Sequence, residues 1–167
     1  MKKKEKAKSL VKPEASFRVL EPVDAPQLAK LYDQTFKVYP FPIFEPDYLT
    51  KTMEENIEYY GAFAGNKLIA ASSAEKDEEN RNAEMTDFAT HPDHRGRNLS
   101  FFLLKEMEKE LGNQDFKTLF TIARAESIGM NTTFARRDYK YGGTLVNNTQ
   151  IGEDIECMNV WYKNLES

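Results

Sequence analysis

The chain has 167 residues, of which 40% are hydrophobic and 30% are charged, the balance of a globular domain with one core. A net charge of −4 and a pI near 5.4 argue against a general affinity for nucleic acid or for an acidic membrane surface, because both need an extended basic face. No apolar run is long enough to span a membrane, and the lysine-rich start lacks the apolar segment of a signal peptide. We therefore expect a cytoplasmic protein with neither a nucleic-acid nor a membrane partner.

The lysine-rich residues 1–14 predict a flexible tail, and residues 15–167 predict a single domain. Apolar spacing and turn residues then predict the elements of the first half. In chain order these are a strand at 17–20, a helix ending near 36, a loop rich in proline and aromatic residues, a helix at 46–56, strands at 57–64 and 67–74 joined at Gly65 and Asn66, a polar surface turn at 75–82 and a strand at 83–90.

The second half opens with an amphipathic helix, since apolar residues recur at helical spacing from Leu99 to Leu111. Further patterns predict a turn at 113–117, a strand at 118–123, a helix at 128–136, and two last strands at 139–146 and 155–162 around a polar loop.

A short basic loop joins the strand at 83–90 to this helix. The loop contains Arg95, Gly96 and Arg97 and runs into the start of the helix. Backbone N–H groups and the positive end of the helix dipole would then point to the same place, an anion site that suits a pyrophosphate. The loop lacks the GxxxxGK[ST] pattern of a P-loop and the three glycines of a dinucleotide fingerprint. A simpler alternative is that Asn98 caps a core helix.

The loop sequence RGRNLS resembles the acetyl-CoA loop, RGxGxG or RGxGxA, of the Gcn5-related N-acetyltransferase (GNAT) superfamily. Asn98 and Ser100 depart from that pattern, although asparagine tolerates positive φ and is a favoured N-cap. The order of elements also matches. The resemblance implies an α+β, three-layer GNAT fold with a mixed, mostly antiparallel sheet of about seven strands flanked by about four helices.

The resemblance also implies acetyl-CoA as co-substrate, held by the end of the strand, the loop and a later helix. The implied positions are Phe88, Ala89, Thr90, Arg95, Gly96, Arg97, Asn98, Leu99, Ser100, Asn131 and Phe134. For Asn131, a helix N-cap is the alternative. His91 and His94 have no cysteine or carboxylate cluster at zinc spacing, so we expect no metal.

Longer phrases resemble one branch of the superfamily. The chain resembles the β-lysine N-acetyltransferases over roughly residues 17–165. The phrases that carry this resemblance are EMTDFAT, TIARAESIGMN, YKYGGTLVNNTQI and ECMNVWYKNL. That branch acts beside a lysine 2,3-aminomutase and acetylates the terminal amine of β-lysine, which gives the compatible solute Nε-acetyl-β-lysine and implies a role in osmoprotection. The loop does not determine which amine is acetylated, so the acceptor could also be another small amine or a protein lysine. A further alternative is a binding module that holds acetyl-CoA or an amino acid without turnover. A homodimer is compatible with this branch.

The chemistry needs a base, because an alkyl ammonium with a pKa near 10.4 must lose a proton before it attacks a thioester. Glu84 matches the base position of the histone-acetylating members of the superfamily. Asp87 is then either an anchor for the substrate amine or a competing base. Strict alternation along the strand would place Glu84 and Asp87 on opposite faces, unless a bulge intervenes.

Three further residues are candidates. Tyr39, in the aromatic loop, either lines a substrate pocket or packs on the core. The guanidinium of Arg124 either holds a substrate carboxylate or forms a surface ion pair. Phe134 occupies the place of the tyrosine that protonates the leaving thiolate in this superfamily and cannot donate, so either Tyr139 or Tyr141 substitutes for it, or no acid is needed because a thiol of pKa near 8.5 leaves as its anion.

Overall fold

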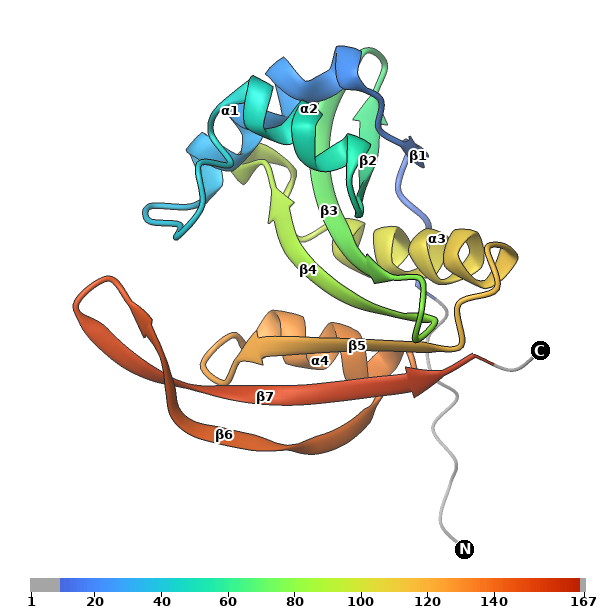
Figure 1. The fold of residues 1–167 in the computed structure, drawn as a ribbon. Coiled ribbons are helices and arrows are strands. Elements are labelled where there is room, and N and C mark those ends of the chain that lie inside the picture. Colours follow the sequence, from blue (N-terminus) through green and yellow to red (C-terminus); the bar gives the residue numbers. More distant parts are fainter. Residues whose placement is uncertain (1–9, 166–167) are drawn as a thin grey trace, which may run out of the picture.

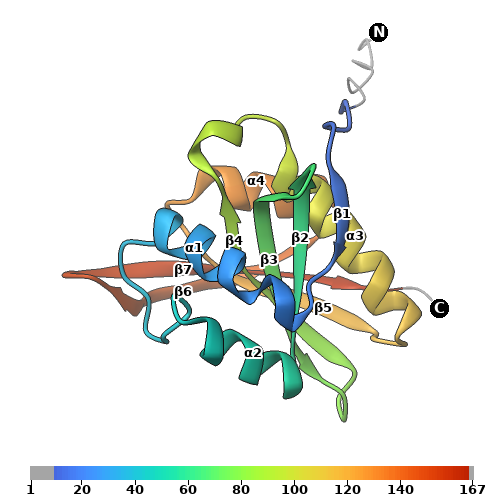
Figure 2. The same cartoon turned by 90° about the horizontal axis from the view of Figure 1, so that it is seen from above.

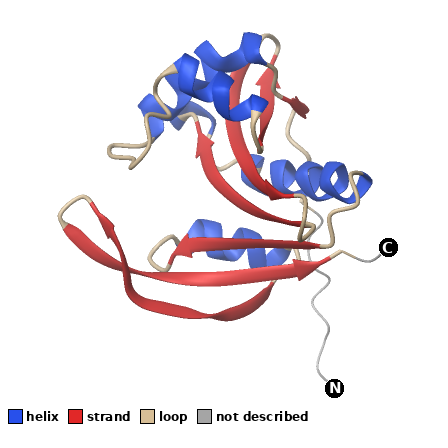
Figure 3. Cartoon of the chain, in the orientation of Figure 1, coloured by secondary structure: helices blue, strands red, loops and turns tan. Residues whose placement is uncertain are grey.

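The structure, a computed structural model, describes residues 10–165. Within this range one sheet has the strand order β1-β2-β3-β4-β5-β7-β6, antiparallel throughout except for the parallel pair β4 and β5 (Figures 1 and 3). The elements are β1 Ser16–Val19, η1 Pro22–Asp24, α1 Ala25–Thr35, α2 Pro46–Glu54, β2 Ile57–Ala64, β3 Lys67–Asp77, β4 Asn82–Thr90, η2 Pro92–His94, α3 Leu99–Asn113, β5 Thr118–Arg124, α4 Ile128–Arg136, β6 Lys140–Ile151 and β7 Asp154–Asn164.

The sheet is the middle of three layers. Helices α1 and α2 cover one face of β2, β3 and β4, while α3 and α4 lie on the other (Figure 2). The first face buries residues such as Leu28 and Tyr59 in one apolar cluster, and the second buries Met85 and Leu104 in another. Two buried faces explain why β2 and β3 read as nearly continuous runs of buried residues.

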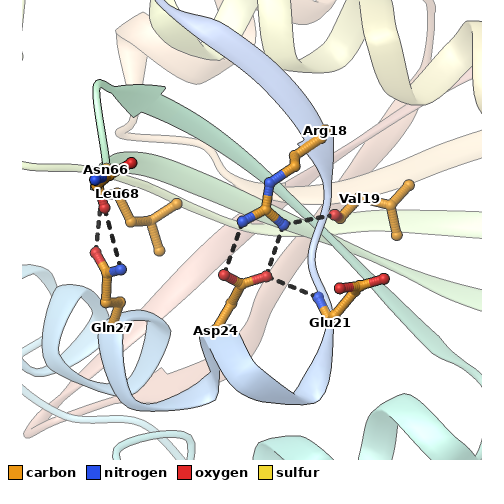
Figure 4. Close-up of polar contacts among 7 residues, drawn as sticks. All are labelled: Arg18, Val19, Glu21, Asp24, Gln27, Asn66 and Leu68. Atoms are coloured by element: carbon orange, nitrogen blue, oxygen red, sulfur yellow. Dashed lines mark hydrogen bonds and ion pairs between the residues drawn. The ribbon is translucent and has the colours of Figure 1, made fainter.

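Polar contacts fix α1 against the sheet (Figure 4). The guanidinium of Arg18 on β1 donates to both carboxylate oxygens of Asp24 at 2.7 and 2.8 Å, and Asp24 also accepts from the amide of Glu21 at 2.9 Å. Gln27 bridges to the turn of the β2–β3 hairpin through the carbonyl of Asn66 and the amide of Leu68. These bonds hold the start of α1 beside β1 and beside that hairpin.

Strand β4 contains a bulge at Asp87. Ser73 of β3 pairs with Thr86, but Ala71 pairs with Ala89, so β4 has one residue more than β3 across this step. The φ of Asp87 is +53°, in the left-handed region. The extra residue reverses the alternation, which brings Asp87 to the face that carries Glu84. The two acids therefore share a face through a bulge, the exception to strict alternation that the sequence left open.

Strands β4 and β5 part soon after they begin (Figure 1). They pair over only three residues each, Asn82 to Glu84 with Thr118 to Phe120. The hydroxyl of Thr121 then donates to the carbonyl of Met85 at 2.7 Å. Beyond this contact no strand of the described residues pairs with the β5 side of β4, so the peptide groups at the end of β4 are open to a ligand there.

The predicted fold class and element order are confirmed, with two corrections. Residues 75–77 belong to β3, so the predicted surface turn shrinks to 78–81. The predicted polar loop near the end is mostly strand, since β6 runs to Ile151 and β7 begins at Asp154. Both segments are polar because they lie at exposed parts of the sheet, and polar strands resemble loops in composition. Of the predicted tail, residues 1–9 lie outside the described range, and the single domain stays a prediction.

Candidate active site

The basic loop before α3 leaves its amides open. Gly96 and Asn98 both have positive φ, +77° and +59°. Among residues 10–165 no acceptor takes the amides of Gly96, Arg97 or Asn98, and the first turn of any α-helix has N–H groups without intrahelical partners. The residues from Arg95 to Asn98 are exposed. The loop therefore has the free amides and the helix terminus that the anion-site prediction requires.

Asn98 does not act as a side-chain cap. It precedes α3, as predicted, with its backbone in the left-handed region, and its side chain makes no capping hydrogen bond. Leu99 is buried and Ser100 is half-buried, so they anchor the helix beneath the loop. Asn98 is thus the N-cap residue of α3, as the alternative held, but within residues 10–165 no side chain accepts a hydrogen bond from the amides at the start of α3.

Three carboxylates gather on the α1/α2 face of the sheet. Glu75 on β3 is the direct cross-strand partner of Glu84 on β4, and the bulge adds Asp87 to the same face. Like charges directly opposite each other destabilise a sheet. Within the described part of the chain no lysine, arginine or histidine forms an ion pair with any of the three. This acid cluster, Glu75, Glu84 and Asp87, carries uncompensated negative charge.

Burial and mutual repulsion raise the pKa values of the cluster. Burial, followed by the charges of Glu75 and Asp87, raises the pKa of Glu84 to about 7. Partial burial and the charge of Asp87 also raise the pKa of Glu75, although that side chain stays exposed. Burial raises the pKa of Asp87 despite the hydrogen bonds that it accepts. A carboxyl with a pKa near 7 is matched to general-base catalysis at neutral pH.

Asp87 is held by three hydroxyl groups. Tyr39 and Thr86 donate to Oδ1, the latter at 3.3 Å, while Ser73 donates to Oδ2 at 2.9 Å. Tyr39 comes from the loop between α1 and α2, and its ring packs against Phe36 with the centroids 5.4 Å apart. Burial and the nearby charge of Asp87 raise the pKa of Tyr39 above its ordinary value. Tyr39 thus joins the aromatic loop to the acid cluster.

Sequence reasoning missed Glu75, which it assigned to a surface turn. The signal was present in two forms. Ser73 and Glu75 flank the core residue Ala74 with the period of two that a strand shows. The hairpin register also aligns Glu75 with Glu84.

Arg124 forms an ion pair within the chain, the second of the two alternatives that the sequence left open for it. Its guanidinium donates to both carboxylate oxygens of Glu156, from Nε at 2.7 Å and from Nη2 at 2.5 Å. Arg124 is exposed and Glu156 is buried, and the guanidinium lowers the pKa of that carboxyl. The forked donor set is therefore already filled from within the chain.

Asn131 lies inside α4, four residues after the N-cap Ser127, so the N-cap alternative is wrong. Its amide nitrogen donates to the carbonyls of Arg124 and Ser127 at 2.9 and 2.8 Å. Its amide oxygen accepts from Asn159 at 3.0 Å and from the Trp161 indole at 2.8 Å. Asn131 thus clamps the end of β5 and the start of α4 to β7, and its predicted contact with a cofactor stays a prediction.

Phe88, Phe134 and Tyr139 form a row of edge-to-face rings, with centroids 5.7 and 5.0 Å apart. Phe134 is only 1% exposed, so it has almost no surface to offer a cofactor and belongs to the core. The hydroxyl of Tyr139 is buried and has no hydrogen-bond partner in the part of the chain that the structure describes, and burial together with the charge of Glu108 raises its pKa. Glu108 lies about 13 Å along α3 from Leu99. This setting corrects the prediction that Tyr139 protonates the leaving group.

A sheet that divides between β4 and β5, with free amides at the start of the following helix, defines an acyl-CoA-type transferase fold. The chain belongs to the acetyltransferase (GNAT) family, whose sequence profile matches residues 25–142. It is 44% identical over 147 residues to the β-lysine N(6)-acetyltransferase of Methanococcus maripaludis, covering 88% of this chain and 54% of that protein.

Two other relatives are similar at the same level. The N-acetyltransferase YodP of Bacillus subtilis is 43% identical, with 92% of this chain and 56% of that protein covered. The β-lysine N(6)-acetyltransferase of Methanosarcina mazei is 38% identical, with 98% and 60% covered. The chain thus spans a little over half the length of the curated relatives that it matches.

Solved structures with low sequence identity share the fold. The ribosomal-protein-S18-alanine N-acetyltransferase of Escherichia coli superposes with a TM-score of 0.78 at 15% identity, over 92% of this chain and 95% of that one. The spermidine/spermine N-acetyltransferase SpeG of Vibrio cholerae gives 0.77 at 15% identity, over 90% and 94%. In residues 10–165 no helix has the length and apolarity to cross a membrane, and no group of acidic, histidine or cysteine side chains is arranged to hold a metal.

Proposed function

We propose that this chain is an acetyl-CoA-dependent N-acetyltransferase that acetylates the terminal amine of β-lysine. The observation that carries the proposal is Glu84, a half-buried acid with a pKa of about 7 beside the point where β4 and β5 part. Family membership supports the reaction, and two curated relatives bear the name of this activity.

The chain's own groups fit the cofactor. The free amides around Gly96 and the N-terminus of α3 would hold the diphosphate, with Arg95 and Arg97 adding positive charge from the rim. The unpaired side of β4 beyond Glu84 would hold the thioester end. Backbone N–H groups from Phe88 to Thr90 are the donors that we assign to the oxyanion of the intermediate. Acetyl-CoA itself supplies the activated acetyl group.

Glu84 receives the proton of the incoming ammonium, either directly or through a water. The amine nitrogen then forms a bond to the acetyl carbon, the bond between that carbon and sulfur breaks, and the nitrogen loses its second proton to solvent or to the departing thiolate. Tyr139 is buried beside Glu108, which argues against its protonating the sulfur, and the exposed Tyr141 stays an alternative acid. A thiol of pKa near 8.5 is a tolerable leaving group as its anion, so the mechanism needs no dedicated acid.

The wider biology belongs to the same proposal. The product would be the compatible solute Nε-acetyl-β-lysine in the cytoplasm, with β-lysine supplied by a lysine 2,3-aminomutase. A homodimer is compatible with this role. The alternatives are transfer to another small amine or to a protein lysine, and a module that binds acetyl-CoA or an amino acid without turnover.

The test is to incubate the protein with acetyl-CoA and a panel of amines and to follow the release of free thiol. We expect β-lysine to react fastest, with mass spectrometry locating the acetyl group on the terminal nitrogen. Equal or zero rates with β-lysine would remove the specific claim. Tight binding of acetyl-CoA with no thiol release for any amine would favour the binding module.

A further inference from the structure

We propose that Glu75 is a specificity-determining residue, which binds a second, non-reacting ammonium group of the acceptor while Glu84 serves the nitrogen that is acetylated. The acceptor class is then a short aliphatic molecule with two cationic nitrogens. This inference rests on the proposed function and assigns to Glu75 a role that the transfer chemistry does not require.

The charge of the site is the first argument. Glu75, Glu84 and Asp87 share one face of the sheet, and no basic side chain in residues 10–165 pairs with them. A single ammonium would neutralise only part of this charge. A ligand with two positive charges neutralises more of the negative charge of the cluster. The ligand then relieves the repulsion between Glu75 and Glu84, which favours its binding.

The placement of the three acids is the second argument. Glu84 and Asp87 are half-buried, whereas Glu75 is exposed and can be reached from solvent. Directly opposed strand residues have Cβ atoms about 5 Å apart. Two nitrogens joined by a four-carbon chain lie about 6 Å apart when the chain is extended. A diamine of this length can therefore contact Glu75 with one end and Glu84 with the other.

An unpartnered buried hydroxyl is the third argument. Tyr32 on α1 is 0% exposed, and its hydroxyl has no hydrogen-bond partner among the described residues. Burial, followed by the charge of Asp87 and the neighbouring Tyr59 and Tyr39, raises the pKa of Tyr32. Buried polar groups are normally satisfied, so the hydroxyl of Tyr32 is a polar group left without a partner in the surroundings of Asp87.

The competing explanation is internal. Glu75 and Glu84 could share a proton, so that Glu75 serves only to raise the pKa of Glu84. In that case its removal changes the pH profile for every amine alike. In the proposed role, its removal affects only acceptors that carry a second ammonium.

The experiment compares Glu75→Gln with the wild type on two matched acceptors, 1,4-diaminobutane and butylamine, which differ by one amino group. Glu79→Gln, in the exposed turn between β3 and β4, is the control. Because the charge of Glu75 also raises the pKa of Glu84, the rates are compared at about pH 8.5, where Glu84 is ionised in both proteins. There we expect Glu75→Gln to raise the KM for the diamine at least tenfold, with kcat and the monoamine KM nearly unchanged. The control should leave all of these values as in the wild type.

An equal effect on both acceptors, or no effect, would overturn the proposal while leaving the acetyltransferase assignment standing. If the wild type acetylates no amine, the proposed function itself has failed. Calorimetric titration of the diamine into both proteins then decides the role of Glu75, because weaker binding to Glu75→Gln supports it and unchanged binding overturns it.

Discussion

Glu84 on β4 lies directly opposite Glu75 on β3, and the two are joined on their face by Asp87 from the bulge. Neither glutamate has a basic partner within residues 10–165. A sheet tolerates such a pair at a cost in stability, and functional sites are where such costs concentrate. The Glu75–Glu84 pair is therefore a primary target for mutagenesis.

Glu84→Gln should abolish the base without changing the shape of the side chain. General-base catalysis typically contributes about 10²- to 10⁴-fold, so we expect kcat to fall by about 10²-fold or more. The wild-type rate should rise as the pH passes through about 7, where Glu84 loses its proton, and this rise should vanish in the variant. Steady-state pH profiles of both proteins check the prediction. An unchanged profile would transfer the role of base to Asp87 or to water.

The same substitution should stabilise the fold at high pH. Because the folded state raises the pKa of Glu84 from 4.5 to about 7, the folded protein binds the proton more tightly than the unfolded chain does. Stability is therefore lost as the pH rises from 4.5 to 7. We expect Glu84→Gln to raise the Tm at pH 8 and to do so less at pH 5. Thermal melts at both pH values measure the difference, and a larger gain at pH 5 would contradict it.

Tyr39→Phe should weaken the acceptor site, because it removes one of the three hydroxyl donors to Asp87. With less hydrogen bonding to its ionised form, the pKa of Asp87 should rise further, and less negative charge would remain to attract an ammonium. We expect a several-fold increase in the amine KM with little change in the Kd for acetyl-CoA.

Tyr48→Phe is the matched control for this experiment. Tyr48 is half-buried on α2, and its hydroxyl makes no hydrogen bond with the described residues. If both variants raise the KM equally, the effect comes from the aromatic layer and not from the bond to Asp87.

Gly96→Ala should weaken the binding of acetyl-CoA. A Cβ at Gly96 meets no atom within 4 Å, so the substitution acts through its φ of +77°, where an L side chain costs about 1–2 kcal/mol. The loop would relax from the conformation that presents its amides, and we expect the Kd for acetyl-CoA to rise about tenfold.

Gly129→Ala provides the control for the loop, since Gly129 is an exposed helical position with open space and no positive φ. Calorimetric titration of acetyl-CoA into both variants separates the effects. An unchanged Kd for Gly96→Ala would show that these amides do not hold the diphosphate.

Most of the fold could be predicted from the sequence, because apolar spacing and turn residues agree in the buried elements. The helix from Leu99 and the hairpin at Gly65 and Asn66 appear where the patterns indicate. The errors fall at exposed polar strands, such as the end of β3 and the tip of the β6–β7 hairpin. In these segments backbone hydrogen bonds form the strand, and the side chains show no alternation of apolar and polar residues that would predict it.

The candidate site was only partly predictable. Glu84, Asp87 and Tyr39 could be named from motif positions and composition, but their common face depends on a bulge that no residue pattern announces. The partners of Arg124 and Asn131 on β7 lie 28 or more residues away along the chain, at Glu156, Asn159 and Trp161. Such contacts are set by the tertiary fold, and local spacing does not reveal them.

The surplus residue in β4 also limits how this segment can change. Deleting Asp87 would restore a regular ladder with β3 and remove its carboxylate from the acid cluster. Deleting Phe88 or Ala89 would instead place Asp87 opposite Ser72 and turn it to the α3 side of the sheet, away from Glu84. A substitution in this segment changes the chemistry of the site, whereas a deletion takes Asp87 out of it. We therefore expect natural sequences to vary here by substitution and not by deletion.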